Sequence, residues 1–303
     1  GGMAALELLD AAGTVLAGGT AAAANADVVL DSFTAPAAGT YYIRVSGVNR
    51  MEYRMVVTRD GIFERECNDE IASAASISLQ KAVLGHIGDP AVVGYYTDFY
   101  PASRAPGHVI NRAGFIPIQI SDIAAFDLST VEILMVNELN NAEISPELLS
   151  RLPDIEAWVR NGGLFVVHDR FVSTDIGDPQ PNPLLIGAAS TMMDRDFVYG
   201  NDIDVIIPDT LITAGPNGTI DDYTLDAANF SNHGFAIADT LPAGSISFFS
   251  SGPVANNRVA AFAYALDWGF VYYATIPLDY FLDVSGDNSF KTIYTPNLLL
   301  YIN

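Results

Sequence analysis

The chain has 303 residues, half of them hydrophobic, and 36 acidic residues against 14 basic residues give it a net charge of −22. A surface this acidic repels phosphate backbones and anionic membrane faces, which excludes nucleic acid as an expected partner. Membrane insertion is not expected either, because no apolar run approaches the roughly 18 residues of a spanning helix. The length suits about two domains.

Residues 1–60 are predicted to form a small antiparallel β-sandwich. Alternating segments such as YYIRVSG and YRMVVT are separated by glycine, asparagine and aspartate, a pattern typical of short strands joined by turns. About four strands leave sheet edges and half of a core uncovered. We therefore expect upstream residues or a neighbouring copy of the chain to complete this unit by strand addition.

Residues 61–89 contain an acidic linker around the single cysteine, in the stretch FERECNDE. Because side chains alternate along an extended segment, Glu64, Glu66 and Asn68 lie on one face and Cys67 lies on the other, where it serves as a small packing residue. The oxygen donors are Glu64, Glu66, Asn68 and Asp69, with Asp89 as a weaker addition. Calcium prefers six to eight oxygen ligands, so Ca²⁺ is the expected ion. A solvated linker without metal is the alternative.

Residues 90–303 are predicted to form an α/β domain. The runs AVVGYYTDFY, VEILMVNE and LFVVHDRF are almost continuously apolar, which indicates parallel strands covered on both faces. Between the last two runs, residues 144–163 are predicted to be helical. Ser145 can cap this helix with Pro146 in its first turn, Gly162 and Gly163 end it, and Pro153 is expected to break or kink it.

The first 58 residues resemble the C-terminal half of a bacterial pre-peptidase C-terminal domain, a family that includes the collagen-binding domains of clostridial collagenases. The resemblance lies in LELLDAAGTVLA, in FTAPAAGTYYIRVSG and in a closing Y-x-M-V-V strand. Residues 64–89 resemble the opening of a second such domain, whose continuation is absent. In collagen-binding members, the E-x-E-x-N-D linker holds calcium together with acids of the domain body, which implies the same role for the linker donors here.

Residues 90–303 resemble the glutamine-amidotransferase-like, flavodoxin-like domains of bacterial proteins. The resemblance lies in the helix ending W-V-x-x-G-G, in the following L-F-V-V-H, and in the closing strand and terminal helix of GFVYYATIPLDYFLD and NLLLYIN. Class I amidotransferases use a cysteine nucleophile after a strand, with a downstream histidine and glutamate. The equivalent position here holds His168 and Asp169, so amidotransferase activity is not expected.

A residual catalytic site would use His168, Asp169 and His233, since ligands of open α/β sheets bind beyond the carboxyl ends of the strands and histidine is the commonest general base. The alternative, which we favour, is that these residues make structural hydrogen bonds. On this interpretation the chain is not an enzyme.

Together these patterns predict a multidomain protein: an incomplete antiparallel β-sandwich, similar to a partial jelly roll, followed by a three-layer α/β domain. The expected function is that of a non-enzymatic structural or adhesive module of a secreted or cell-surface bacterial protein, part of a longer polypeptide and located outside the cell. Calcium would fix its linker. Expected partners are other copies, other domains of a longer chain, extracellular matrix or carbohydrate, with assembly into a surface layer or filament. The alternative is an accessory substrate-binding portion of a secreted hydrolase or peptidase.

Overall fold

The computed structural model of the chain describes residues 5–21, 28–30, 33–46, 61–63, 82–84, 91–227 and 230–303. The chain divides into two compact units, Gly1–Asp89 and Pro90–Asn303. The further division of residues 1–89 at residue 60 stays a prediction.

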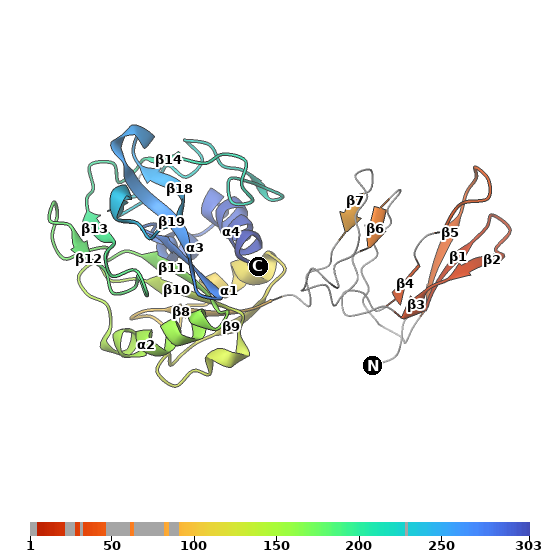
Figure 1. Cartoon of the computed structure of the whole chain (residues 1–303), viewed down its shortest axis with the longest axis horizontal. Coiled ribbons are helices and arrows are strands. Elements are labelled where there is room, and N and C mark those ends of the chain that lie inside the picture. The colour runs from red at the N-terminus through yellow and green to blue at the C-terminus, as the bar shows by residue number, and fades with distance from the viewer. Residues whose placement is uncertain are drawn as a thin grey trace. The chain divides into compact units, whose positions relative to one another are not determined.

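In the described part of the first unit, the main element is a three-stranded antiparallel sheet in the order β2-β1-β5 (Figure 1). These strands are β1 (Ala5–Leu9), β2 (Val15–Gly18) and β5 (Tyr42–Ser46). Asp10 closes the β1–β2 turn, because its Oδ1 accepts from the backbone N–H groups of Ala12 and Thr14. Short strands form two further pairs: β3 (Thr20–Ala21) with β4 (Val28–Val29), and β6 (Gly61–Phe63) parallel to β7 (Ala82–Leu84). Antiparallel strands are present as predicted, while the sandwich itself stays a prediction.

The second unit is built on a large mixed sheet of 11 described strands. Its parallel part has the order β9-β8-β10-β11-β20, and an antiparallel part continues from β20 through β19, β17, β13 and β12, with β18 also pairing with β19 and β14 with β18. The parallel strands are β8 (Val92–Thr97), β9 (Ile116–Gln119), β10 (Ile133–Glu138), β11 (Leu164–Asp169) and β20 (Gly269–Ala274). The antiparallel strands are β12 (Gln180–Pro181), β13 (Met192–Arg195), β14 (Ile203–Val205), β17 (Gly234–Ile237), β18 (Ile246–Ser251) and β19 (Arg258–Leu266). The parallel strands were predicted and the antiparallel part was not.

Four α-helices are present in the described part of this unit: α1 (Ala105–Arg112), α2 (Pro146–Arg160), α3 (Leu278–Asp283) and α4 (Thr295–Ile302). Single turns and short pairs complete it: η1 (Leu128–Thr130), η2 (Ala238–Thr240), η3 (Val254–Asn256), a π-turn η4 (Phe290–Tyr294), and the β15 (Ala214–Gly215) and β16 (Gly218–Thr219) hairpin. The domain is therefore rich in β-structure, with few helices. No helix in the described ranges is long and apolar enough to cross a membrane.

The predicted helix α2 begins as expected, because the Ser145 hydroxyl accepts from the backbone N–H of Leu148 at 3.1 Å. Of the break or kink predicted at Pro153, the break is wrong, because the helix continues through this residue to Arg160. Proline removes one backbone donor and leaves the carbonyl of residue 149 without its helical partner. Pro153 and Leu149 are both exposed, so water can satisfy that carbonyl.

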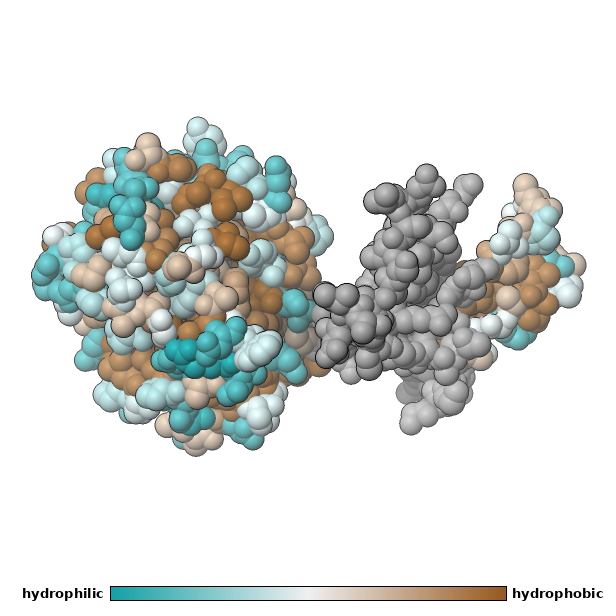
Figure 2. Space-filling view, in the orientation of Figure 1, coloured by the Kyte–Doolittle hydropathy of each residue, from teal (hydrophilic) through white to brown (hydrophobic). Residues whose placement is uncertain are grey.

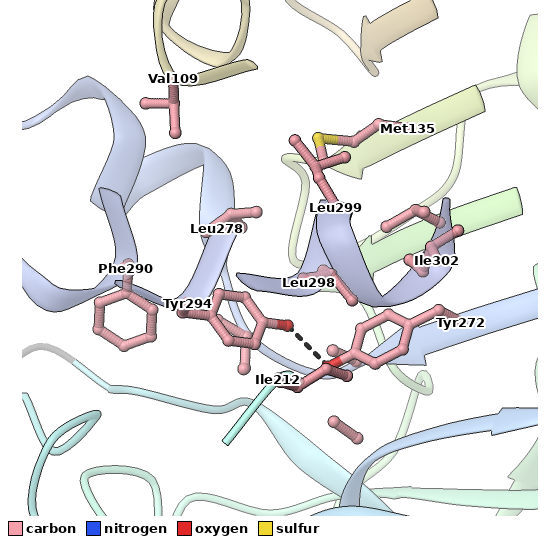
Figure 3. Packing of buried hydrophobic residues seen from close by; sticks show 14 of the residues in the cluster. Val109, Met135, Ile212, Tyr272, Leu278, Phe290, Tyr294, Leu298, Leu299 and Ile302 are labelled. Atoms are coloured by element: carbon pink, nitrogen blue, oxygen red, sulfur yellow. Dashed lines mark hydrogen bonds between the residues drawn. The ribbon is translucent and has the colours of Figure 1, made fainter. Parts of the chain in front are cut away.

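Two hydrophobic clusters cover the two faces of the parallel strands. Helices α1, α3 and α4 contribute to one cluster, and α2 contributes to the other. Because side chains alternate along a strand, Met135 and Tyr272 face the first cluster while Val136 and Tyr273 face the second. Figure 3 shows the first cluster, in which Tyr294 and Tyr272 meet at their hydroxyl groups. Hydrophilic and hydrophobic residues are interspersed over the visible face of this unit (Figure 2).

Candidate functional site

The parallel strands β8, β10 and β11 end in register at one edge of the sheet. Thr97, Asn137 and His168 are direct neighbours across the three strands. We call these three residues the polar row. The residues that follow them, Asp98, Glu138 and Asp169, form the acidic row. Consecutive residues of a strand point to opposite faces, so the two rows lie on opposite sides of the sheet.

The acidic row lies on the side of α2, where Asp98 Oδ2 accepts from the backbone N–H of Ser145 at 2.8 Å. The backbone N–H of Phe171 donates to both neighbouring acids, at 2.9 Å to Glu138 Oε2 and 2.8 Å to Asp169 Oδ1. Asp169 Oδ2 accepts two further hydrogen bonds, from the Tyr273 hydroxyl at 2.5 Å and from Asn182 Nδ2 at 2.6 Å. The acids therefore hold the loop after β11 against the end of β10.

Both carboxyl groups of this pair hold a proton more tightly than a free carboxylic acid does. Burial, followed by the neighbouring charge of Asp169, raises the pKa of Glu138 to about 9. Burial also raises the pKa of Asp169, but hydrogen bonds from Tyr273, Asn182 and the backbone favour its anion. Arg195 acts on both carboxyl groups with its positive charge, and its guanidinium donates to the carbonyls of Asn141 and Phe171. At neutral pH the two carboxyl groups are therefore not both charged.

The polar row lies on the opposite side, where Tyr294 of η4 contacts His168. His168 Nε2 is 2.9 Å from the Tyr294 hydroxyl, which is 2.9 Å from the Tyr272 hydroxyl. The histidine is 1% exposed, and burial lowers its pKa to about 3. The imidazole is therefore neutral at physiological pH. It ends a series of hydrogen bonds that runs from Tyr272 through Tyr294 to His168.

The candidate residues from the sequence are not joined into a catalytic dyad. His168 bonds to Tyr294, and Asp169 bonds to Tyr273 and Asn182 on the other side of the sheet. His233 is 7% exposed, its Nδ1 is 3.1 Å from the carbonyl oxygen of Arg170, and Phe197 packs edge-on against its ring. Burial and the positive charge of Arg170 lower the pKa of His233 to about 4.

The predicted calcium ligands Glu64, Glu66, Asn68, Asp69 and Asp89, together with Cys67, lie outside the described residues. The calcium site therefore stays a prediction. Among the residues that the structure describes, no group of three or more histidine, cysteine or acidic side chains is placed to hold a metal ion.

Sequence reasoning missed Glu138 and Asp98, although a signal was present. Each of the three apolar runs ends in a polar residue followed by an acid: TD at 97–98, NE at 137–138 and HD at 168–169. Parallel strands end at the same edge of a sheet, so these three pairs could have been expected to meet. The partners of these acids, Tyr273, Asn182 and Arg195, come from distant segments of the chain and carried no such signal.

A surface cavity of about 450 Å³ lies beside the acidic row. Its lining residues are Tyr96, Phe99, Pro101, Ser121, Asp122, Ile123, Ser145 and Glu147. Phe99 follows Asp98 in the loop after β8, is 42% exposed and has a φ of +61°, which is uncommon for a bulky residue. An aromatic face and two carboxylates thus meet at the end of the strand.

No protein-family model and no curated protein matches the sequence. Three similar solved structures are a β-galactosidase from Rahnella sp. R3, a cytoplasmic protein from Salmonella typhimurium and an exo-β-1,4-mannosidase from an Opitutaceae bacterium. Their sequence identities to the chain are 12%, 10% and 12%, over 69%, 70% and 71% of it, with TM-scores of 0.41, 0.40 and 0.43. The chain spans 30%, 98% and 36% of their respective lengths. At these TM-scores the similarities assign neither a family nor an activity.

Proposed function

We propose that the chain is a non-enzymatic structural or adhesive module of a secreted or cell-surface bacterial protein. In this proposal the second unit is a glutamine-amidotransferase-like, flavodoxin-like domain, and the first is a pre-peptidase C-terminal-type sandwich. One observation carries the proposal: the three candidate catalytic side chains are buried, and each is hydrogen-bonded to other residues of the protein. His168 is 1% exposed, Asp169 0% and His233 7%.

Burial supports a structural role because a general base must come within hydrogen-bonding distance of the proton that it removes. The Nε2 atom of His168 is occupied by Tyr294, and the lowered pKa makes this imidazole a weak base at neutral pH. Asp169 already accepts three hydrogen bonds. Such a network fixes the loop after β11 in one conformation.

Calcium and self-assembly are further parts of this proposal. The acidic linker would be rigid when a divalent cation neutralises its carboxylates, and like charges would extend it otherwise. The net charge of −22 makes that repulsion strong. A neighbouring copy, or another part of a longer chain, would complete the first unit by strand addition.

Alanine variants of the two buried histidines test the proposal. A structural role predicts that His168→Ala and His233→Ala each lower the melting temperature by several degrees, because each leaves a cavity and removes hydrogen bonds. His108→Ala is the matched control, since His108 is exposed on α1. A variant that keeps full stability but loses hydrolysis of a glycoside, ester or peptide substrate would overturn the proposal.

A second candidate function, accessory substrate binding for a secreted hydrolase, is favoured by the cavity beside Phe99. An exposed aromatic ring next to the Asp122 and Glu147 carboxylates suits a sugar, whose ring stacks on the aromatic face while its hydroxyls donate to oxygen. Affinity electrophoresis in polysaccharide gels tests this function. Phe99→Ala should abolish any retardation, and Tyr223→Ala, which removes an 81% exposed aromatic ring elsewhere, should not.

A further inference from the structure

The polar row contains a concentration of unpaired hydrogen-bonding atoms. In the described part of the chain, seven buried side-chain nitrogen and oxygen atoms lack a hydrogen-bond partner. Four of them belong to the row: Thr97 Oγ1, Asn137 Oδ1 and Nδ2, and His168 Nδ1. The side chains are 3%, 0% and 1% exposed, respectively. Bulk water therefore does not satisfy these atoms.

The strand register brings these four atoms together. Asn137 on β10 is the direct neighbour of Thr97 on β8 and of His168 on β11. Each of the three residues lies two positions after a strand residue that faces the first hydrophobic cluster, namely Tyr95, Met135 and Val166. Residues two positions apart on a strand point to the same face, so the polar row faces this cluster too. Three adjacent strands thus place hydrogen-bond donors and acceptors side by side on one face of the sheet, next to the hydrophobic residues of the first cluster.

Two more unpaired atoms belong to the same edge of the sheet. Arg170 follows β11 and Asp279 lies in α3, which follows β20, and their side chains form a 2.6 Å ion pair. In that pair, Arg170 Nε and Asp279 Oδ1 remain without a partner. Six of the seven unpaired atoms therefore come from this edge; the other is Arg151 Nε.

Buried polar groups in proteins are almost always paired, with protein or with an ordered molecule between them. We propose that the polar row is a binding site for a small neutral hydroxylic ligand, held by Asn137, His168 and Thr97. The ligand is either internal water or the hydroxyl groups of a small polyol. This inference is independent of whether the chain is an enzyme.

The chemistry of the row selects such a ligand. The Asn137 amide donates through Nδ2 and accepts through Oδ1, and the Thr97 hydroxyl does both. His168 is uncharged and its Nε2 faces Tyr294. When the tyrosine hydroxyl donates to Nε2, Nδ1 carries a proton and donates to the ligand. A hydroxyl group, which both donates and accepts, matches this set, whereas an ion would meet no balancing charge from these three residues.

High-resolution crystal structures of the protein, grown without polyols and after soaking in erythritol, test the proposal. The expected result is density at 2.7–3.2 Å from Asn137 and from His168 Nδ1. Water in both crystals identifies water as the ligand, and erythritol in the second identifies a polyol. The proposal is overturned if neither crystal has density there and the Asn137 amide instead bonds directly to Thr97 or His168.

A solution measurement complements the crystals. Long-lived internal water gives exchange contacts in NMR between water and the Asn137 side-chain amide, and a polyol weakens them if it displaces the water. Thr97→Val keeps the shape of the side chain and removes its hydroxyl. The residence time of the internal water should therefore be shorter in that variant. Ser129→Ala, at an exposed hydroxyl far from the row, is the control. Identical lifetimes in all three proteins would contradict the site.

Discussion

Glu138 and Asp169 share a single hydrogen-bond donor, the backbone N–H of Phe171, which lies 2.9 Å from one carboxyl group and 2.8 Å from the other. Two acids this close and this deeply buried cannot both be charged at modest cost. Their environments differ, because Asp169 also accepts from Tyr273 and Asn182. Burial and the neighbouring charge of Asp169 raise the pKa of Glu138 to about 9, so Glu138 keeps its proton at neutral pH, and several measurable properties follow.

The contribution of Glu138 to the stability of the second unit should decrease as the pH rises from about 4.5 to about 9. In this window the folded protein keeps a proton on Glu138 that the unfolded chain releases, so each increase in pH favours unfolding. Glu138→Gln removes this titration and should melt at a higher temperature than the natural protein at pH 8, with a smaller difference at pH 5. Glu143→Gln, at an exposed position, serves as the control. Parallel melting curves for all three proteins would show that Glu138 is not buried as described.

Asp169→Asn should be more destabilising than Glu138→Gln. The Asp169 Oδ2 atom accepts from two side-chain donors, and an amide nitrogen in its place would face those donors with hydrogens of its own. The expected loss is about 1–3 kcal/mol in the free energy of unfolding. Urea denaturation of both variants measures the difference. Equal losses would mean that the two acids have equivalent surroundings.

The buried histidines should add a stability term of opposite sign at low pH. The pKa of His168 is lowered to about 3 and that of His233 to about 4, so between these values and about 6.5 the unfolded chain binds protons that the folded chain does not. The contribution of these two histidines to stability should therefore rise with pH up to about 6.5. The ring signals of both residues in NMR spectra should stay constant from pH 7.5 to pH 5. A midpoint near 6.5 for either ring would contradict its burial.

Calcium should raise the melting temperature of the first unit by several degrees relative to a chelator, because a ligand that binds only the folded state stabilises it. The double variant Glu64→Gln, Glu66→Gln should lose this response, while Glu143→Gln should retain it. Magnesium at equal ionic strength controls for charge screening. Identical melting in calcium and in chelator would remove the linker site from the proposal.

The fold could be predicted where the sequence carries a local signal. The runs at 92–97, 133–138 and 164–169 are apolar on both faces, and this pattern alone indicates buried parallel strands. Helix α2 could be placed from Ser145 and Pro146. Pro153 misled the prediction because the cost of a proline in a helix depends on whether the freed carbonyl is exposed.

The antiparallel part of the sheet could not be predicted in this way. Strand β19 pairs with β20 through a tight turn and with β18 across residues 252–257, whereas residues 238–257 separate it from its other partner, β17. Such pairing depends on the packing of the whole unit, since strand preference reflects the neighbours that a strand acquires. The acidic row did carry a local signal, because each of its acids follows a polar residue at the end of an apolar run. Glu138 and Asp169 are 31 positions apart, and the parallel register of β10 and β11 brings them together.

The central claim is that the side chains of the polar and acidic rows are buried away from solvent. The measurement that tests this claim most directly is the titration of Glu138. Carbon-13 NMR of protein labelled at the glutamate carboxyl carbons, with the signal assigned by its loss in Glu138→Gln, follows this group alone. The burial of Glu138 and the negative charge of Asp169 predict a pKa well above neutrality, at about 9. A titration midpoint near 4.5, the ordinary value for glutamate, would mean that water reaches the strand ends and that they are open to a substrate.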